Sequence, residues 1–535
     1  MGSTLPDAMV AQRAQVLVDM WENGVPVARL DNKSFRRLVE EPHDSIGGRE
    51  GVRQQIPVAV LHLRENVKEK VKGRMVVVMF DGSKVNECVE AVIVRYLDDD
   101  DEIQHICIGA HMVSLNMNAV SLFTLVKKHL AEVGIDDAQI VFAVSDSAAV
   151  NPAMVDHWNN LIKELFGDDY DERRLFWMGC VSHGLSNAGT KMRKEALLVK
   201  TFFSGFKKMS NTSSSGRFLW KQLTGSSCPV LCDNRWWAWF DCASEVYEHW
   251  KKVPEFLHQM AQRGISEKST IKMKSIADKK AKWLALELQI RACLVFGKPF
   301  RDACVLLEGD GFTLPFVSET LREIRQLMQA FELQRAQHPL FSDLLERLHD
   351  AGINEAQRYS FLDSHVLPVI EAGMKHFKES IWQKFSHHFG LFDAAAIFHP
   401  LVFLDKYGTA GFGELLLKHC KLFSDLKGVP RDASDFRFKL SAELESYAGQ
   451  AKRFKDDWQE DEKNQTPKAL WRFWKSQKVR LKSFFALAQI LVLIVPSSAA
   501  VERFFSIVKA QTSPQQNAEY ADTFTGRCMA LYNPK

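Results

Sequence analysis

The sequence has no apolar run long enough to cross a membrane. Its longest apolar stretch, residues 484–495, is interrupted by Gln489, and a transmembrane helix needs about 20 apolar residues. A stretch of this length favours a helix buried in the protein core. The N-terminal sequence MGSTLPDAMVAQRAQV also lacks the apolar centre of a secretory signal peptide. We therefore expect a soluble intracellular protein with no membrane partner.

Paired cysteines are missing as well. None of the ten cysteines belongs to a Cys-x-x-Cys pair, and scattered cysteines without a secretory signal favour reduced thiols in the cytosol or nucleus. Cys180 and His183 have the Cys-x-x-His spacing of two zinc ligands, but no second pair with suitable spacing supplies the other two. We expect no structural zinc, and buried packing is the favoured role of this motif.

An excess of charge of one sign is also absent. The 535 residues include 69 basic and 66 acidic side chains, which gives a net charge of +3. Any nucleic-acid surface must therefore be a local patch. Three basic clusters, residues 191–194, 272–282 and 472–482, could contact phosphates, although a solvated helix face is the default interpretation of each. The length predicts roughly two to four domains.

Short apolar runs rich in β-branched residues are present after residue 73 and predict strands. Helical patterns separate the later runs: residues 120–133 place apolar side chains on one face, and Asn151-Pro152 predicts the cap and first turn of another helix. The order is strand–strand–strand–helix–strand–helix–strand, in which a three-strand meander is followed by strands parallel to the first. The predicted strands are residues 75–80, 88–96, 103–115, 140–144 and 175–178.

Five consecutive acidic residues, 98–102, lie between the second and third predicted strands. We expect them to form a solvated turn, because adjacent like charges are costly to bury.

Helical periodicity dominates the rest of the chain. Residues 1–73 predict an N-terminal helical region, and residues 245–470 are almost entirely helical in pattern, as in a domain inserted into or following an α/β domain. Thr466-Pro467 predicts the start of a long helix, from residue 468 to about 495, and Pro496 ends it before a last helix that contains Glu502. The expected fold class is α/β plus α.

Asp81 and Asp146 are the leading candidates for chemistry. Each follows a predicted central strand, and the ends of adjacent strands bring two carboxylates close together at the edge of a sheet. A divalent cation would relieve their repulsion, and a pair of Mg²⁺ ions can cleave phosphodiesters. The alternative is that each aspartate only caps a turn, since Asp-Gly is a common turn signal.

Arg235 and Trp236 belong to the sequence NRWWAW, in which three tryptophans fall within four residues. An aromatic cluster in the core beside a surface arginine is the favoured interpretation from composition. The functional alternative is contact between this aromatic and cationic pair and unstacked DNA.

Several of these motifs together resemble the hAT superfamily of cut-and-paste DNA transposases. The most specific is FFALAQILVLIVPSSAAVERFFS, residues 484–506, which resembles the dimerisation region of the family, with Trp474 at the position of an upstream tryptophan. VSDSAAVNP resembles the strand and loop that carry the second aspartate of the family, CVSHGL matches its Cys-x-x-His motif, and NRWW matches its Arg-Trp motif. All occur in the order found in the family.

The resemblance implies an RNase H-like mixed sheet flanked by helices and interrupted by a large all-helical insertion domain. It implies a catalytic, metal-binding triad of Asp81, Asp146 and Glu502 with Mg²⁺, or Mn²⁺ as an alternative, and contact of Arg235 and Trp236 with double-stranded DNA. A homodimer or higher oligomer formed through the C-terminal region, in the nucleus, is also implied. The corresponding domains are 1–73, the first part of the catalytic core at 74–244, the insertion at 245–470, and the dimerisation region at 471–535 that completes the core.

The sequence departs from the family, and three hypotheses stay open. No Cys and His cluster typical of a BED zinc finger precedes Asp81. The first hypothesis is an active transposase, supported by all three carboxylates. The second is a domesticated, catalytically inactive protein that binds DNA and dimerises. The third, an RNase H-like nuclease that is not a transposase, leaves the C-terminal motif unexplained.

Overall fold

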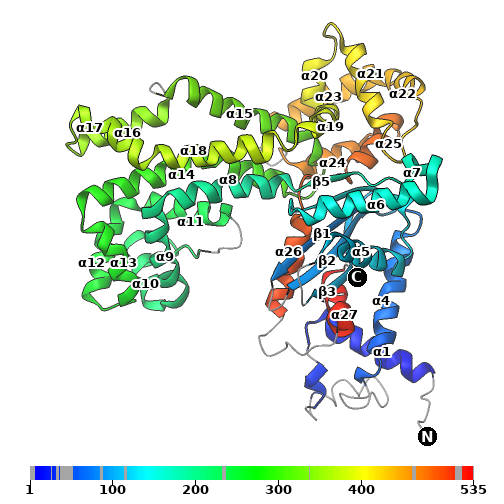
Figure 1. Cartoon of the computed structure of the whole chain (residues 1–535), viewed down its shortest axis with the longest axis horizontal. Coiled ribbons are helices and arrows are strands. Elements are labelled where there is room, and N and C mark those ends of the chain that lie inside the picture. The colour runs from blue at the N-terminus through cyan, green and yellow to red at the C-terminus, as the bar shows by residue number, and fades with distance from the viewer. Residues whose placement is uncertain are drawn as a thin grey trace. The chain divides into compact units, whose positions relative to one another are not determined.

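We describe a computed structural model of the chain, shown in Figure 1. The residues described are 7–25, 27–31, 35, 52–84, 88–113, 117–231, 236–335, 338–460, 465–511 and 521–533.

The strands form one mixed sheet in the order β3-β2-β1-β4-β5. The antiparallel meander consists of β1 (Val76–Lys84), β2 (Cys88–Leu97) and β3 (Ile103–Val113). On the other side of β1, β4 (Ile140–Ser145) and β5 (Trp177–Gly179) run parallel to it. The predicted strands and their order are thus confirmed, and the sheet is consistent with an RNase H-like fold.

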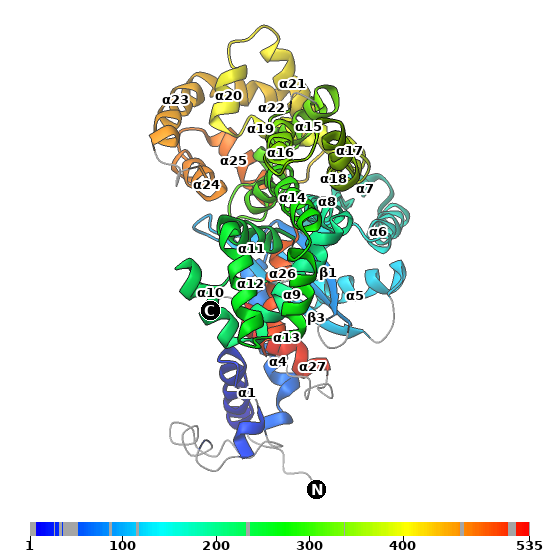
Figure 2. The same cartoon turned by 90° about the vertical axis from the view of Figure 1, so that its left-hand side faces the viewer.

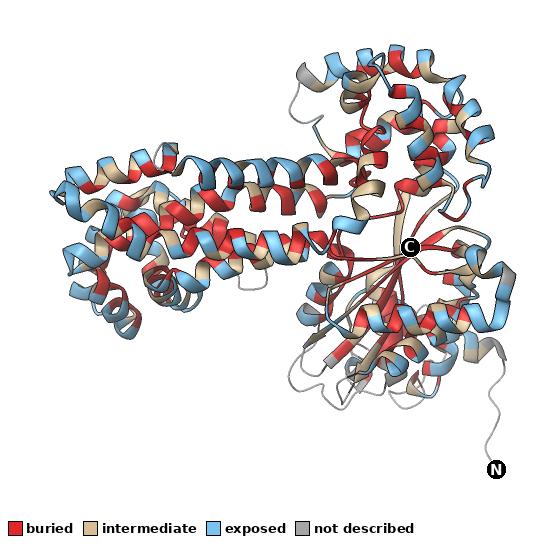
Figure 3. Cartoon of the chain, turned by 45° about the horizontal axis from the view of Figure 1, so that its top comes forward, coloured by how far each residue is buried: buried red, intermediate tan, exposed pale blue. Residues whose placement is uncertain are grey.

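The centre of the sheet is buried because apolar residues occupy both of its faces. All residues of β4 are buried, as are residues 76–80 of β1, the pattern expected of central strands that are covered on both sides. Figure 3 shows these strands in red among helices that have exposed outer surfaces.

The chain divides into two compact units. The first contains Met1–Cys180, Glu308–Pro315 and Gly390–Lys535, and the second contains Val181–Leu307 and Phe316–Phe389. The mixed sheet lies in the first unit, and an all-helical region follows it in the sequence, as expected of the α/β plus α class. The domain boundaries at 244/245 and 470/471 stay a prediction.

Helices of the first unit pack around the sheet. Helices α4 and α27 contact β3, and α26 contacts β1 and β2; Figures 1 and 2 both place α26 beside β1. The helices and 3-10 turns of this unit are α1 (Asp7–Glu22), η1 (Val27–Asp31), α4 (Ile56–Val71), α5 (Ala119–Glu132), η2 (Asp137–Gln139), α6 (Val150–Phe166), η3 (Gly167–Asp169), α7 (Tyr170–Arg173), α19 (Phe389–Ala396), α20 (Pro400–Lys406), α21 (Phe412–Phe423), α22 (Ala433–Ser441), α23 (Leu444–Glu460), α24 (Pro467–Ser476), α25 (Lys482–Leu491), α26 (Ala499–Gln511) and α27 (Ala521–Tyr532), with η5 (Leu314–Phe316) at its boundary.

The second unit is helical throughout its described residues. Its longest helix, α14 (Lys280–Leu307), packs against α8 (Val181–Glu195), which also packs against α18 (Leu367–Phe377). The other helices and short turns are α9 (Leu197–Thr212), α10 (Ser214–Thr224), α11 (Trp236–Glu248), η4 (Trp250–Lys252), α12 (Val253–Gln262), α13 (Glu267–Ala277), α15 (Val317–Leu333), α16 (Pro339–Asp350), α17 (Glu355–His365), η7 (Lys378–Trp382) and η8 (Ser386–His388).

Two helix predictions are corrected by the structure. The helix expected from 468 to about 495 is two helices, α24 and α25, although Thr466 does cap the first of them by accepting a hydrogen bond from the Ala469 N–H. Helix α6 begins at Val150, so Asn151 lies in its first turn and is not its cap. The side chain of Asn151 donates instead to Asp146.

The acidic turn at 98–102 is only partly solvated, which corrects another expectation. Asp101 is buried because its carboxylate accepts hydrogen bonds from Lys478 and Gln489, each 2.6 Å long. Its backbone carbonyl also accepts a 2.9 Å hydrogen bond from the Trp471 indole. The turn therefore docks on α24 and α25, and these bonds offset the cost of burying the charge.

A buried arginine holds the segment 308–315 against the sheet. The Arg95 guanidinium on β2 donates to the carbonyls of Gly311 and Val492, both at 2.8 Å, and burial lowers the pKa of Arg95 to about 9. Gly311 has φ of 120°, and a Cβ there would lie 2.4 Å from the Lys468 nitrogen. Only glycine allows this close passage of two backbones.

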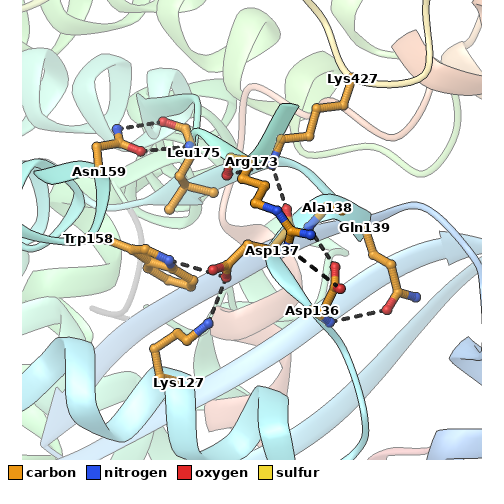
Figure 4. A network of polar contacts seen from close by, with 10 residues as sticks. All are labelled: Lys127, Asp136, Asp137, Ala138, Gln139, Trp158, Asn159, Arg173, Leu175 and Lys427. Atoms are coloured by element: carbon orange, nitrogen blue, oxygen red, sulfur yellow. Dashed lines mark hydrogen bonds and ion pairs between the residues drawn. The ribbon is translucent and has the colours of Figure 1, made fainter. Parts of the chain in front are cut away.

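Figure 4 shows a polar network that holds the start of β4. The Lys427 ammonium donates to the carbonyls of Asp137 (2.6 Å) and Arg173 (3.0 Å). The Asp137 carboxylate pairs with Lys127 at 2.7 Å and accepts a 3.3 Å hydrogen bond from the Trp158 indole. Burial lowers the pKa of Lys427 to about 8. The network fixes the N-terminal end of the strand that leads to Asp146.

Among the described residues, no single helix is both long and apolar enough to cross a membrane. One sharply bent pair, Ser386–Ala396 with Pro400–Lys406, meets the length and composition test only when its two parts are joined.

Candidate active site

Asp81 and Asp146 lie at the same edge of the sheet. The parallel pairing of β1 with β4 ends with Phe80 opposite Ser145, so the next residue of each segment is one of the two aspartates. This carboxyl edge of parallel strands is where ligands commonly bind in α/β sheets. Contrary to the expectation that Asp81 ends its strand, β1 continues to Lys84, because antiparallel pairing with β2 extends past the end of β4.

The loop after β4 orients the Asp146 carboxylate. Its Oδ1 accepts hydrogen bonds from the Asn151 side-chain amide at 2.6 Å and from the Ala148 backbone N–H at 2.9 Å. Ser145, the last residue of β4, is itself held by the Trp177 indole, which donates to its hydroxyl at 2.8 Å. Both bonds to Asp146 use one oxygen, so the rotation of the carboxylate is restrained.

Glu502 reaches the same edge from the distant C-terminal segment. It lies in the first turn of α26, which packs against β1 and β2, and its negative charge contributes to raising the pKa of Asp81. The turn before α26 is anchored to the end of the sheet, because the Ser498 N–H donates to the Cys180 sulfur at 3.3 Å. Asp146 and Glu502 thus both interact electrostatically with Asp81.

A fourth carboxylate, Glu90, was missed by sequence reasoning. In the pairing of β1 with β2, Glu90 stands opposite Gly82, and its carboxylate covers that glycine so closely that a Cβ on Gly82 would lie 2.4 Å from Glu90 Oε1. The available signal was the single acidic residue of strand β2, but only the strand register shows that it faces the Asp-Gly step.

The surroundings of Asp81 and Glu90 favour the protonated forms of these two carboxyl groups. Burial, the neighbouring Asp146 and, more weakly, Glu502 and Glu90 hold the pKa of Asp81 well above its usual range, although a 2.8 Å hydrogen bond from the Gly82 N–H lowers it. Burial and then Asp146 raise the pKa of Glu90 to about 7. Like charges in a partly buried cluster resist ionisation together, so a bound cation would stabilise the ionised site.

The donor set suits a hard divalent cation, although it is not a preformed cage. Within the described ranges, no group of three or more His, Cys, Asp or Glu side chains is arranged to hold a metal ion. Mg²⁺ is usually bound by only one or two carboxylates together with water and substrate phosphates. The oxygen-only chemistry of Asp81, Asp146 and Glu502 is of the kind that such an ion prefers.

The Cys-x-x-His and Arg-Trp motifs lie elsewhere in the sequence, and their described residues differ in exposure. Cys180 follows β5 and is buried, whereas His183 on α8 is exposed. Trp236 begins α11, but its side chain and the whole of Arg235 lie outside the described residues. The eight cysteines whose side chains are described are buried thiols that form no disulfide.

No model of a protein family and no curated protein matches the chain.

Proposed function

We propose that this chain is a DNA transposase of the hAT type, which cleaves and joins double-stranded DNA with Asp81, Asp146 and Glu502. The motifs of the C-terminal segment support the family, and the sheet order is compatible with its RNase H-like core. The third carboxylate gives the strongest support: Glu502, more than 350 residues after Asp146 in the sequence, lies in the first turn of α26, which packs against β1 and β2. Its charge is among the causes of the raised pKa of Asp81.

The carboxylates would hold Mg²⁺, with Mn²⁺ as a substitute, and the metal would activate water or a strand end and stabilise the leaving oxygen. Asn151 keeps Asp146 in a fixed orientation through its 2.6 Å hydrogen bond. The Gly82 N–H does the same for Asp81. Glu90 has a pKa of about 7 without a bound metal, and a cation at the neighbouring carboxylates would lower that pKa and favour its ionised form.

The proposal includes the partners that the family resemblance implies. These are double-stranded DNA and a second copy of the chain joined through the C-terminal region, in the nucleus. Arg235 and Trp236 would contact DNA. No structural zinc is part of the proposal.

Cleavage of a supercoiled plasmid in Mg²⁺ by wild type, Asp81→Asn and Asp146→Asn tests the catalytic assignment. We expect both variants to lose cleavage by on the order of 10³-fold while they fold normally, because each removes a charge from the metal site. Asp156→Asn, a change of an exposed carboxylate on α6, is the matched control and should cleave like wild type. A folded wild-type protein that binds DNA and does not cut it would favour the domesticated, inactive protein.

A further inference from the structure

A pocket between α23 and α24 is lined by aromatic and basic side chains. Its volume is about 510 Å³, and its walls include Phe454 and Trp458 from α23 and Phe473 from α24, with Arg453 and Arg472 beside them. This volume is in the range of small-molecule sites, roughly 300–1,000 Å³. The pocket belongs to the first compact unit and is distinct from the carboxylate cluster.

The three rings form a continuous apolar wall. The Phe454 ring centroid lies 5.1 Å from that of Trp458 and 4.9 Å from that of Phe473. Phe454 is buried, whereas Trp458 and Phe473 are only half-buried. Trp458 and Phe473 therefore offer ring surface on which a flat aromatic ligand can stack.

The charge of the pocket favours an anionic ligand. Arg453 and Arg472 are exposed, and neither makes an ion pair with any residue in the described part of the chain. Asp457 supplies one negative charge among the lining residues, so the two arginines leave the wall net positive. A guanidinium group binds phosphate through paired N–H donors.

A buried polar side chain in the wall lacks a hydrogen-bond partner. Gln477 is 7% exposed; its Nε2 donates to the Ser476 hydroxyl at 2.8 Å, while its Oε1 is buried without a donor among the described residues. Exchanging the two ends of the amide would move this deficit to the nitrogen and would not remove it. A ligand with a hydrogen-bonding edge would satisfy the amide and recover the cost of its desolvation.

From these features we infer that the pocket binds a single nucleotide, with its base stacked on Trp458 and Phe473 and its phosphate on Arg453 and Arg472. The edge of the base would meet the amide of Gln477. A nucleotide combines a flat ring, hydrogen-bonding groups at the ring edge and a phosphate, and the pocket provides a partner for each. The nucleotide could be free or could belong to a DNA strand with an unpaired base.

Binding to the full chain, measured by isothermal titration calorimetry, tests this inference with three probes. The probes are deoxyadenosine monophosphate, a single strand of about eight nucleotides, and the same strand without bases. Trp458→Ala and Gln477→Leu should each weaken binding by about tenfold. Phe438→Ala, a change of an exposed ring on α22 outside the pocket, and Arg480→Ala, a change of an exposed arginine outside it, are the controls and should change binding by less than about twofold.

The probes distinguish a free nucleotide from a nucleotide of a DNA strand. Binding of the mononucleotide that depends on Trp458 identifies a free-nucleotide site, and binding of only the strand that carries bases identifies a DNA strand. No binding of any probe, or binding unchanged in both pocket variants that fold normally by circular dichroism, overturns the inference. The result is independent of cleavage, because Asp81→Asn should leave this binding intact.

Discussion

Asp101 is a buried carboxylate whose backbone has a left-handed conformation, with φ of 58°. Its side chain accepts hydrogen bonds from Lys478 and Gln489. Asp101 therefore joins the turn between β2 and β3 to the C-terminal segment. Its contribution to stability comes mainly from the hydrogen bonds and not from the charge of the ion pair, since the Lys478 side chain is 55% exposed to solvent.

Replacing Asp101 should destabilise the protein. Asp101→Ala removes both side-chain hydrogen bonds and leaves alanine at a positive φ, so we expect the free energy of unfolding to fall by about 2 kcal/mol. Urea unfolding followed by circular dichroism measures this change. Asp100→Ala, in the exposed neighbouring residue, should change the free energy of unfolding by less than about 0.5 kcal/mol, and equal losses in the two variants would contradict the assigned role of Asp101.

Glu90 makes stability depend on pH. Its pKa is about 7 in the folded chain, compared with 4.5 for an ordinary glutamate, so the folded state keeps a proton that the unfolded state has lost between these values. The stabilisation is therefore complete below about pH 4.5 and is lost as the pH rises through 7. Without divalent cations, we expect the free energy of unfolding to fall between pH 5 and pH 8.

Glu90→Gln should reduce that dependence by on the order of 1–3 kcal/mol, because the amide cannot ionise. The measurement is urea unfolding of the variant and wild type at both pH values. Glu69→Gln, a change of an exposed glutamate on α4, serves as control. An unchanged pH dependence in Glu90→Gln would show that Glu90 does not take part in the coupled cluster.

At the scale of elements, the strands could be predicted because their signal is local. Runs such as residues 76–80 combine β-branched side chains with complete burial, and no distant residue is needed to favour the strand. The split of the helix expected at 468–495 could not be predicted. Helix α25 begins where the Glu443 carboxylate accepts hydrogen bonds from the backbone N–H groups of Ser483 and Phe484, and this cap comes from 40 residues away.

Some residues of the candidate site could likewise be predicted from the local sequence, and others could not. Asp81 and Asp146 could be predicted from the strand ends that precede them, whereas the place of Glu502 followed from a family resemblance. Glu90 could not be identified, because its role depends on its register opposite Gly82. The local sequence pattern therefore does not reveal which residues face each other across strands, nor which distant side chains cap a helix.

The edge strand β3 is closed by the C-terminal helix. The Asn533 side chain accepts a 2.7 Å hydrogen bond from the Cys107 N–H and donates a 3.1 Å hydrogen bond to the Cys107 carbonyl. It thus replaces the pairing that another strand would give and protects an edge prone to association.

Removing this side chain should expose the edge. In Asn533→Ala, we expect a loss of about 1–2 kcal/mol in the free energy of unfolding, because two backbone groups lose their partner. Hydrogen exchange measured by mass spectrometry should show faster exchange at Cys107 and unchanged exchange in β4. Equal protection of Cys107 in the variant and wild type would contradict the closing role of Asn533.

At the scale of the whole molecule, the unit that holds the sheet is assembled from three separate parts of the sequence. The segment from residue 76 to 179 supplies three carboxylates, and α26 supplies the fourth after more than 300 intervening residues. Such an arrangement makes the site dependent on the folding of both ends of the chain.

Mg²⁺-dependent cleavage of supercoiled plasmid by wild type and Glu502→Gln tests this arrangement most directly. We predict that wild type cuts the plasmid and that Glu502→Gln, folded and still able to bind DNA, loses cleavage by on the order of 10³-fold. Glu69→Gln should cut like wild type. Full cleavage by Glu502→Gln would contradict a nuclease site completed by the C-terminal segment.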